Sequence, residues 1–178
     1  MADSISETIN WAWCGDESEA RALRFLFRKW GVDRSSACLN SAGLVIKAGG
    51  GVLVKAGSAF YAIANNVLVT KTANTDMAAL SGTVTNAKFN VFVFYIDSAG
   101  TLTSAMGTEG ATLAAVKFPL TPDLKAAIGF VVINPTGTGN FVGNTTPLDD
   151  ATVVPNAAYV NLTDAFNPNQ FAQLIAGA

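Results

Sequence analysis

The sequence contains no histidine. Histidine is the side chain that titrates near neutral pH, the base of Ser-His-Asp and Cys-His catalytic groups, and a frequent zinc ligand. Its absence excludes these centres, and no other residue pattern in the chain replaces them. We therefore expect a protein that is not an enzyme and that has no cofactor or metal site.

Charge and long apolar runs are also scarce. Only 13% of the residues are charged, and 11 Lys and Arg residues stand against 13 Asp and Glu residues. Nucleic-acid binding needs a basic surface, so we expect no nucleic-acid partner. No apolar run reaches the roughly 18 residues of a membrane span. The first residues are acidic rather than apolar. We therefore expect neither a membrane partner nor a secretory leader.

Cysteine is rare as well. Cys14 and Cys38 are too few for a disulfide-dense secreted scaffold. Two small buried thiols in a protein made in a reducing cytoplasm are the simpler interpretation, and a bond between the two is the alternative.

Apolar residues, by contrast, make up 50% of the chain and require a folded core. A length of 178 residues fits one domain with an appended segment. All arginines and tryptophans lie within residues 1–40, whereas residues 41–178 are rich in Gly, Ala, Thr, Val and Asn. The composition therefore predicts a helical N-terminal arm, residues 1–40, and a β body with an extended C-terminal tail, residues 41–178.

The arm carries an amphipathic helix pattern. Asp16 is a candidate N-cap with Glu19 as its capping-box partner, and Gly31 is a candidate C-cap. Apolar residues between these caps recur at helical spacing, with arginines on the opposite face. Such a helix either packs on its own body or docks on a partner through tryptophan and arginine anchors. The candidate interface residues are Trp11, Trp13, Arg21, Arg24, Phe27, Arg28 and Trp30.

The pattern of the body predicts antiparallel hairpins. A glycine-rich turn separates apolar runs at residues 44–47 and 52–55. Two adjacent asparagines, which tolerate positive φ, separate residues 60–64 from residues 67–70 in the same way.

The remaining pattern sets the fold class. Residues 89–96 are apolar on both faces, as expected for a central strand. Residues 114–118 and 127–133 are further candidate strands, and residues 76–80 are a candidate helical turn. Short strands without long helices between them predict a mainly β fold, an antiparallel β-sandwich or jelly-roll-like barrel.

The C-terminal tail, residues 153–178, is apolar and short of charge. It contains Tyr159, Phe166 and Phe171. We expect this tail to lie against its own sheet or against a neighbouring subunit, because an apolar segment in water is sticky.

Two patterns come close to binding motifs. Gly137, Gly139 and Gly143 follow a predicted strand, but their spacing differs from the dinucleotide motif GxGxxG and no helix pattern follows. Asp149 and Asp150 are adjacent carboxylates without the spacing of a calcium loop. We interpret the three glycines as turn residues and the acidic pair as solvated or turn-forming, and we expect no catalytic, cofactor-binding or metal-binding residue.

Five segments of the body carry a family resemblance. They are residues 45–50 (VIKAGG), 59–65 (AFYAIAN), 92–97 (FVFYID), 107–111 (GTEGA) and 129–135 (GFVVINP). Across residues 41–169 the chain resembles uncharacterised virion structural proteins of tailed bacteriophages. The resemblance implies a capsid or tail component without enzymatic activity, and it carries over no functional residue.

We therefore expect a virion protein made in the host cytoplasm, most simply a capsid decoration or cement protein that stabilises the head shell through subunit contacts. The expected partners are the major capsid protein and other copies of this chain, assembled as a trimer. A tail fibre, adaptor or baseplate component is the first alternative. A carbohydrate-binding β-sandwich is the second.

Overall fold

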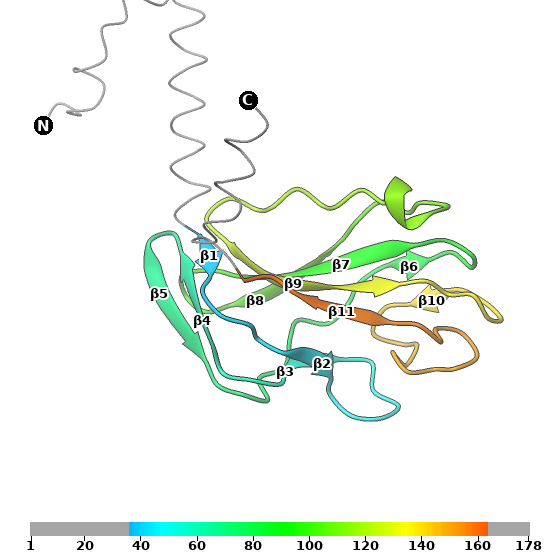
Figure 1. Ribbon diagram of the computed structural model, residues 1–178, viewed down its shortest axis with the longest axis horizontal. Helices are drawn as coiled ribbons and strands as arrows, with labels where there is room; N and C mark the ends of the chain where they lie inside the picture. The colour runs from blue at the N-terminus through cyan, green and yellow to red at the C-terminus, as the bar shows by residue number, and fades with distance from the viewer. Residues whose placement is uncertain (1–35, 164–178) are drawn as a thin grey trace, which may run out of the picture.

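The computed structural model describes residues 36–163, and residues 1–35 and 164–178 lie outside this description. The described chain is mainly β, and its strand pairings are antiparallel (Figure 1). The strands are β1 (Ala37–Cys38), β2 (Leu44–Ile46), β3 (Val54–Ala56), β4 (Phe60–Ala64), β5 (Val67–Lys71), β6 (Thr83–Val84), β7 (Asn90–Ile96), β8 (Leu102–Met106), β9 (Ala126–Ile133), β10 (Phe141–Val142) and β11 (Ala158–Asn161). The predicted helical arm lies outside the described residues except for its last few positions.

The strands form four sheets, and the largest is built around β7. Its order is β11–β9–β7–β8, and the smaller sheets have the orders β1–β4–β5, β2–β3 and β10–β6. Every residue of β7 is buried, so the prediction of a central strand covered on both faces is confirmed. The sheets of the described chain are open and none closes on itself, so residues 36–163 form no closed barrel.

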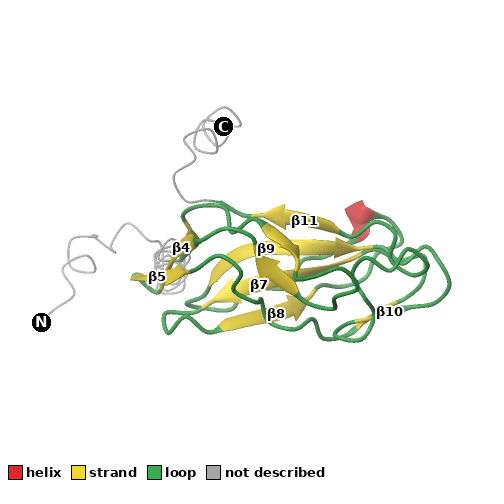
Figure 2. Ribbon diagram, turned by 90° about the horizontal axis from the view of Figure 1, so that it is seen from below, coloured by secondary structure: helices red, strands yellow, loops and turns green. Residues whose placement is uncertain are grey.

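The inner face of the four-stranded sheet holds the main core. Phe92, Phe94 and Ile96 of β7 are fully buried there. Phe92 packs edge-on against Phe141 of β10, with ring centroids 5.9 Å apart. Buried residues from the three smaller sheets cover the same face, so the body has two layers with the core between them (Figure 2).

Both predicted hairpins are confirmed. β2 pairs with β3, and the glycine-rich turn contains Gly50 at a φ of 71°, a backbone conformation that suits glycine. β4 pairs with β5 through Asn65 and Asn66, which have φ values of 50° and 63°. Two consecutive residues with positive φ give the turn the twist that the flanking strands need.

The helical turn predicted at residues 76–80 is wrong, because this segment is extended. Asp76 forms a β-bridge with Lys55, and the Met77 N–H donates to the Val54 carbonyl at 2.8 Å. Met77 and Leu80 are buried in the main core. Packing against β3 overrides the local helical pattern.

The strand predicted at residues 114–118 is also wrong. Leu113–Ala115 form a short 3-10 turn, η2, with no buried residue. Of the predicted strand only Lys117 forms a β-bridge, with Thr108. Pro119 follows directly and has no N–H to donate, so a ladder cannot continue here.

The ends of the described chain belong to the body. β1 pairs with β4, so residues assigned to the arm at positions 37–38 are part of a sheet. β11 pairs with the edge of β9, and Tyr159 packs against the main core. The first part of the predicted tail therefore lies on its own sheet, whereas Phe166 and Phe171 lie outside the described residues. The described chain begins at β1 and ends after β11 at the same end of the body (Figure 1).

Candidate interaction surface

The predicted interface residues of the arm lie outside the described residues. They are Trp11, Trp13, Arg21, Arg24, Phe27, Arg28 and Trp30. A candidate surface therefore has to come from residues 36–163.

The outer face of the four-stranded sheet is such a surface. Val91, Val93 and Tyr95 of β7 form a second buried cluster on this face, separate from the main core. Partly buried apolar residues of β8 and β9 pack beside the cluster. Direct cross-strand partners on β8, β7, β9 and β11 form one apolar row: Ala105, Val93, Phe130 and Val160.

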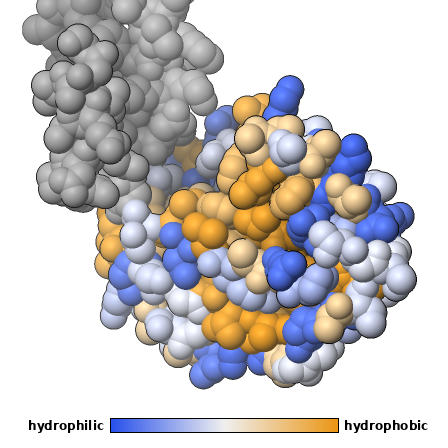
Figure 3. All heavy atoms as spheres, turned by 45° about the vertical axis from the view of Figure 1, so that its right-hand side comes forward, coloured by the Kyte–Doolittle hydropathy of each residue, from blue (hydrophilic) through white to orange (hydrophobic). Residues whose placement is uncertain are grey.

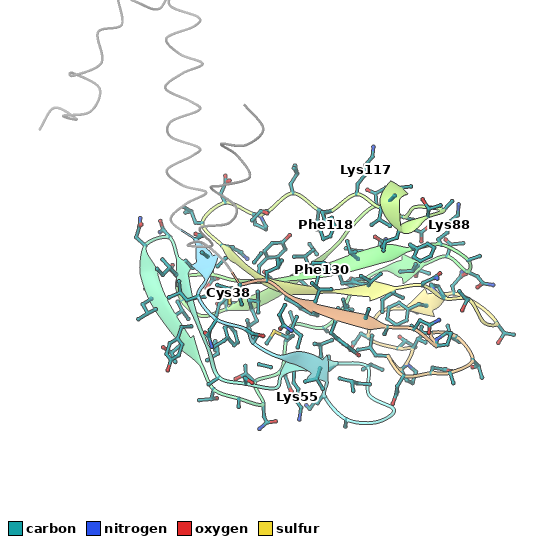
Figure 4. All side chains as sticks on the ribbon, in the orientation of Figure 1. Cys38, Lys55, Lys88, Lys117, Phe118 and Phe130 are labelled. Atoms are coloured by element: carbon teal, nitrogen blue, oxygen red, sulfur yellow. The ribbon has the colours of Figure 1, made fainter. Side chains whose placement is uncertain are left out.

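Residues 117–125, which we call the strap, cross this face on the way from η2 to β9 (Figure 1). Phe118 packs edge-on against Phe130, with ring centroids 5.0 Å apart and an interplanar angle of 87° (Figure 4). At the other end the Lys125 Nζ donates to the Thr103 Oγ1 at 3.1 Å. Burial raises the pKa of Tyr95, and a hydrogen bond with the Thr121 side chain opposes that rise.

Several apolar side chains of the strap point away from the core. Leu120 is 94% exposed, Phe118 is 56% exposed and Leu124 is 43% exposed. Phe130 connects Phe118 to the partly exposed Val160, because it packs on the first and lies opposite the second. We call Phe118, Leu120 and Leu124, which all lie on this one segment, the strap patch. Single exposed apolar residues are common, but a group on one segment is typical of a contact surface.

Charged residues lie on the strap and on the same side of the body. Lys117 and Lys88 project from the same side of the body (Figure 4), and Asp123 and Lys125 lie on the strap itself. Apolar areas alternate with polar ones on the side of the body shown in Figure 3. An apolar centre with a polar, solvent-accessible rim is the arrangement found in protein–protein interfaces.

Two carboxylates of the body, Asp97 and Asp150, hold turns. The Asp97 Oδ1 accepts hydrogen bonds from the N–H groups of Thr101 at 2.8 Å and Ala99 at 3.0 Å. The bond from Thr101 is the main cause that lowers the pKa of Asp97. Asp150 does the same for Thr152, whose side chain and N–H lower the pKa of this carboxyl. These acids act on their own backbone, as short polar turn residues do.

Asp149 links two loops. Its carboxylate accepts the Gly50 N–H at 2.9 Å, and the Leu148 N–H donates to the Gly51 carbonyl at 2.9 Å. The Asp149–Asp150 pair is thus occupied by backbone donors, in agreement with its interpretation as turn-forming. Within residues 36–163 there is no group of three or more His, Cys, Asp or Glu side chains suited to a metal ion.

The three glycines that come close to a dinucleotide-binding motif lie in backbone turns and loops. Gly137 and Gly139 lie in a loop, and Gly143 lies in a turn. The Gly143 N–H donates to the Gly82 carbonyl at 2.8 Å, and the Thr138 N–H donates to the Thr152 carbonyl at 2.8 Å. The interpretation of these glycines as turn residues is confirmed.

Cys38 is a buried free thiol in the described chain. Its Sγ donates to the Asn40 carbonyl at 3.2 Å, and burial raises the pKa of the thiol. A raised pKa lowers the thiolate fraction and hence the reactivity. Cys38 therefore fits the interpretation as a buried structural thiol, and Cys14 lies outside the described residues.

No helix within residues 36–163 is long and apolar enough to cross a membrane. No family model, curated protein or solved structure matches the chain.

The sequence interpretation missed the strap patch as a surface. The signal that could have revealed it is the pair Pro119 and Pro122. Two prolines so close together prevent the residues around them from joining a β-ladder, so the apolar Leu120 between them lies outside the sheet.

Proposed function

We propose that this chain is a structural protein of a phage particle, a capsid decoration or cement protein that binds the head shell and stabilises it through subunit contacts. The resemblance of residues 41–169 to virion structural proteins supports the proposal. In it, the two layers of the body are a β-sandwich, and the partners are the major capsid protein and other copies of this chain.

The strap patch is the observation that carries this proposal. Leu120 and Phe118 expose apolar surface on a segment that the Phe118–Phe130 contact and the Lys125–Thr103 hydrogen bond hold in place. Full burial of one such side chain contributes about 1.5–3 kcal/mol. Because the segment is already ordered, a partner gains this burial with little further loss of conformational entropy.

A shell multiplies such contacts. A cement protein adds one modest interface per copy, and the shell is stabilised by the sum over all copies. The seven candidate interface residues of the arm would add a second attachment to the shell. The combined effect of two linked attachments exceeds that of either one.

The test is the location of the chain in purified particles. Particles from cells that produce the chain are separated into heads and tails, and each fraction is probed with an antibody raised against residues 41–163. We expect the chain in the head fraction, at a constant ratio to the major capsid protein between preparations. Detection in the tail fraction alone would make it a tail component instead, and absence from both fractions would contradict a virion role.

A further inference from the structure

The pairing of β4 with its neighbours determines which backbone groups of β5 point to the free side of that strand. β5 is the last strand in the order β1–β4–β5. On β4, the Tyr61 carbonyl accepts the Leu39 N–H at 2.8 Å, and the Tyr61 N–H donates to the Asn40 Oδ1 at 2.7 Å. The backbone N–H and carbonyl groups of Tyr61 therefore point away from β5. Backbone direction alternates along a strand, so Ala62 and Ala64 face β5.

The same alternation applies to β5. Val69 and Val67 lie opposite Ala62 and Ala64, so their backbone groups face β4. The N–H and carbonyl groups of Leu68 and Thr70 then point to the free side. No described residue donates or accepts a backbone hydrogen bond there. Figure 1 shows β5 at the margin of the body, with no described strand beyond it.

This edge lacks the usual protection against pairing. Natural edge strands carry charges, prolines or bulges that prevent association with another strand. The pairing of β4 with β5 is regular, and the single charge on β5 is Lys71 at its end. Leu68 is 62% exposed and Val67 is 46% exposed. An exposed, regular and apolar edge of this kind is a site for adding a strand.

We propose that β5 pairs with β5 of a second copy of this chain, antiparallel and around a two-fold axis at Val69. In this register Leu68 lies opposite Thr70 of the second copy, and Thr70 lies opposite its Leu68. Each pair exchanges two backbone hydrogen bonds, and Val69 faces Val69 of the second copy as a non-hydrogen-bonded pair. The two three-stranded sheets become one continuous sheet.

The edge is complementary to itself, which is why the partner is a second copy. When a second copy of the strand runs in the reverse direction, the free N–H groups of Leu68 and Thr70 meet the free carbonyl groups of the same two residues in that copy. Lys71 falls opposite Val67 of the second copy, so the two ammonium groups lie at opposite ends of the pairing and do not repel each other directly. The exposed Leu68 side chains gain a neighbouring strand on their open side.

This inference goes beyond the proposed function, since the pairing forms in the purified chain without a capsid. It also differs from the trimer expected from the sequence, because an isologous two-fold contact closes at two copies. Failure of the pairing leaves the strap patch and the proposed particle role untouched.

A cysteine placed on the two-fold axis is the first test. The full chain carries Cys14→Ser, which removes the cysteine outside the described residues, together with Val69→Cys. The α-carbons of a non-hydrogen-bonded antiparallel pair are about 4.5 Å apart, within disulfide range. We expect a disulfide-linked dimer on mild oxidation. Val67→Cys in the same background is the control. Val67 is 46% exposed against 9% for Val69, but it lies opposite Lys71, so we expect it to stay monomeric on a reducing-agent-free gel despite its greater access to oxidant.

Proline at the edge is the second test. Leu68→Pro and Thr70→Pro each remove an N–H that the monomer does not use, so the body keeps its fold. Each loses two hydrogen bonds across the symmetric contact, and we expect association to weaken at least about tenfold in sedimentation equilibrium. Leu68→Thr keeps the N–H and is the control, with a smaller effect than either proline.

Three results would overturn the pairing. One is a wild-type chain that stays monomeric through the high-micromolar range. Another is an assembly whose mass and affinity are unchanged by both proline variants. A third is equal cross-linking of Val69→Cys and Val67→Cys. If a proline variant does not fold, as circular dichroism would show, the two cysteine variants decide the question on their own.

Discussion

Phe118 and Phe130 pack edge-on with ring centroids 5.0 Å apart, and this contact fastens the strap to the outer face of the four-stranded sheet. Phe130 is at the same time the cross-strand partner of Val93, whose side chain lies in the second buried cluster. The outward side of Phe118 remains exposed beside Leu120. Phe118 therefore both holds the strap in place and contributes to the exposed strap patch.

Two phenylalanines should differ in their effect on stability. Phe92→Ala removes a fully buried ring that packs on Phe141, so we expect the free energy of unfolding to fall by about 3–5 kcal/mol. Phe118→Ala removes a half-exposed ring, so we expect a loss of about 0.5–1.5 kcal/mol. Urea denaturation of both variants measures the difference, and equal losses would contradict the assignment of Phe92 to the core.

Gly129 lies where β9 passes close to two neighbours. A Cβ at this position would lie 2.5 Å from the Leu44 Cδ1 and 2.5 Å from the Val160 carbonyl oxygen. We expect Gly129→Ala to destabilise the body by about 1–3 kcal/mol, because the backbone of β11 has to move. Gly49→Ala is the control, since the nearest atom to its Cβ is the Asp149 Oδ2 at 3.8 Å. Equal thermal midpoints for the two variants would show that β11 shifts without a cost in stability, and would contradict this prediction.

The β4–β5 turn depends on positive φ at Asn66. We expect Asn66→Ala to destabilise the hairpin by about 1 kcal/mol, because alanine has a Cβ and no polar group to relieve the left-handed conformation. Asn66→Gly removes that penalty and should be as stable as the wild type or more so. Thermal unfolding of the two variants measures this, and a stability order of alanine above glycine would exclude the left-handed turn.

The hairpins and the central strand could be predicted from the sequence because their signals are local. Asn65 and Asn66 mark a turn by their own conformational preference, and residues 89–96 show apolar residues on both faces. The strap could not be predicted, since the exposure of Leu120 depends on a crossing over a sheet formed by distant strands. The extended conformation of residues 76–80 likewise follows from contact with β3 rather than from the segment itself.

Acid should weaken the β7–β8 turn through Asp97. Folding lowers the pKa of this carboxyl from its ordinary value of 3.8, because the ionised form accepts the Thr101 and Ala99 N–H groups. The sign follows from linkage: the stabilisation is fully present above the unfolded pKa and is lost as pH falls through the folded pKa. We expect the stability difference between the wild type and Asp97→Asn to shrink below pH 3.8, and a difference independent of pH would contradict the role of the carboxylate.

Co-sedimentation of the purified full chain with heads that lack it tests most directly whether the strap patch binds the head shell, as proposed. Leu120→Lys places a charge on a residue that is 94% exposed, so it leaves folding unchanged. Val142→Lys, on β10 and 40% exposed, is the matched control for an added charge elsewhere. We predict that Leu120→Lys weakens binding to heads at least about tenfold, whereas Val142→Lys binds like the wild type. Undiminished binding by Leu120→Lys would contradict the account.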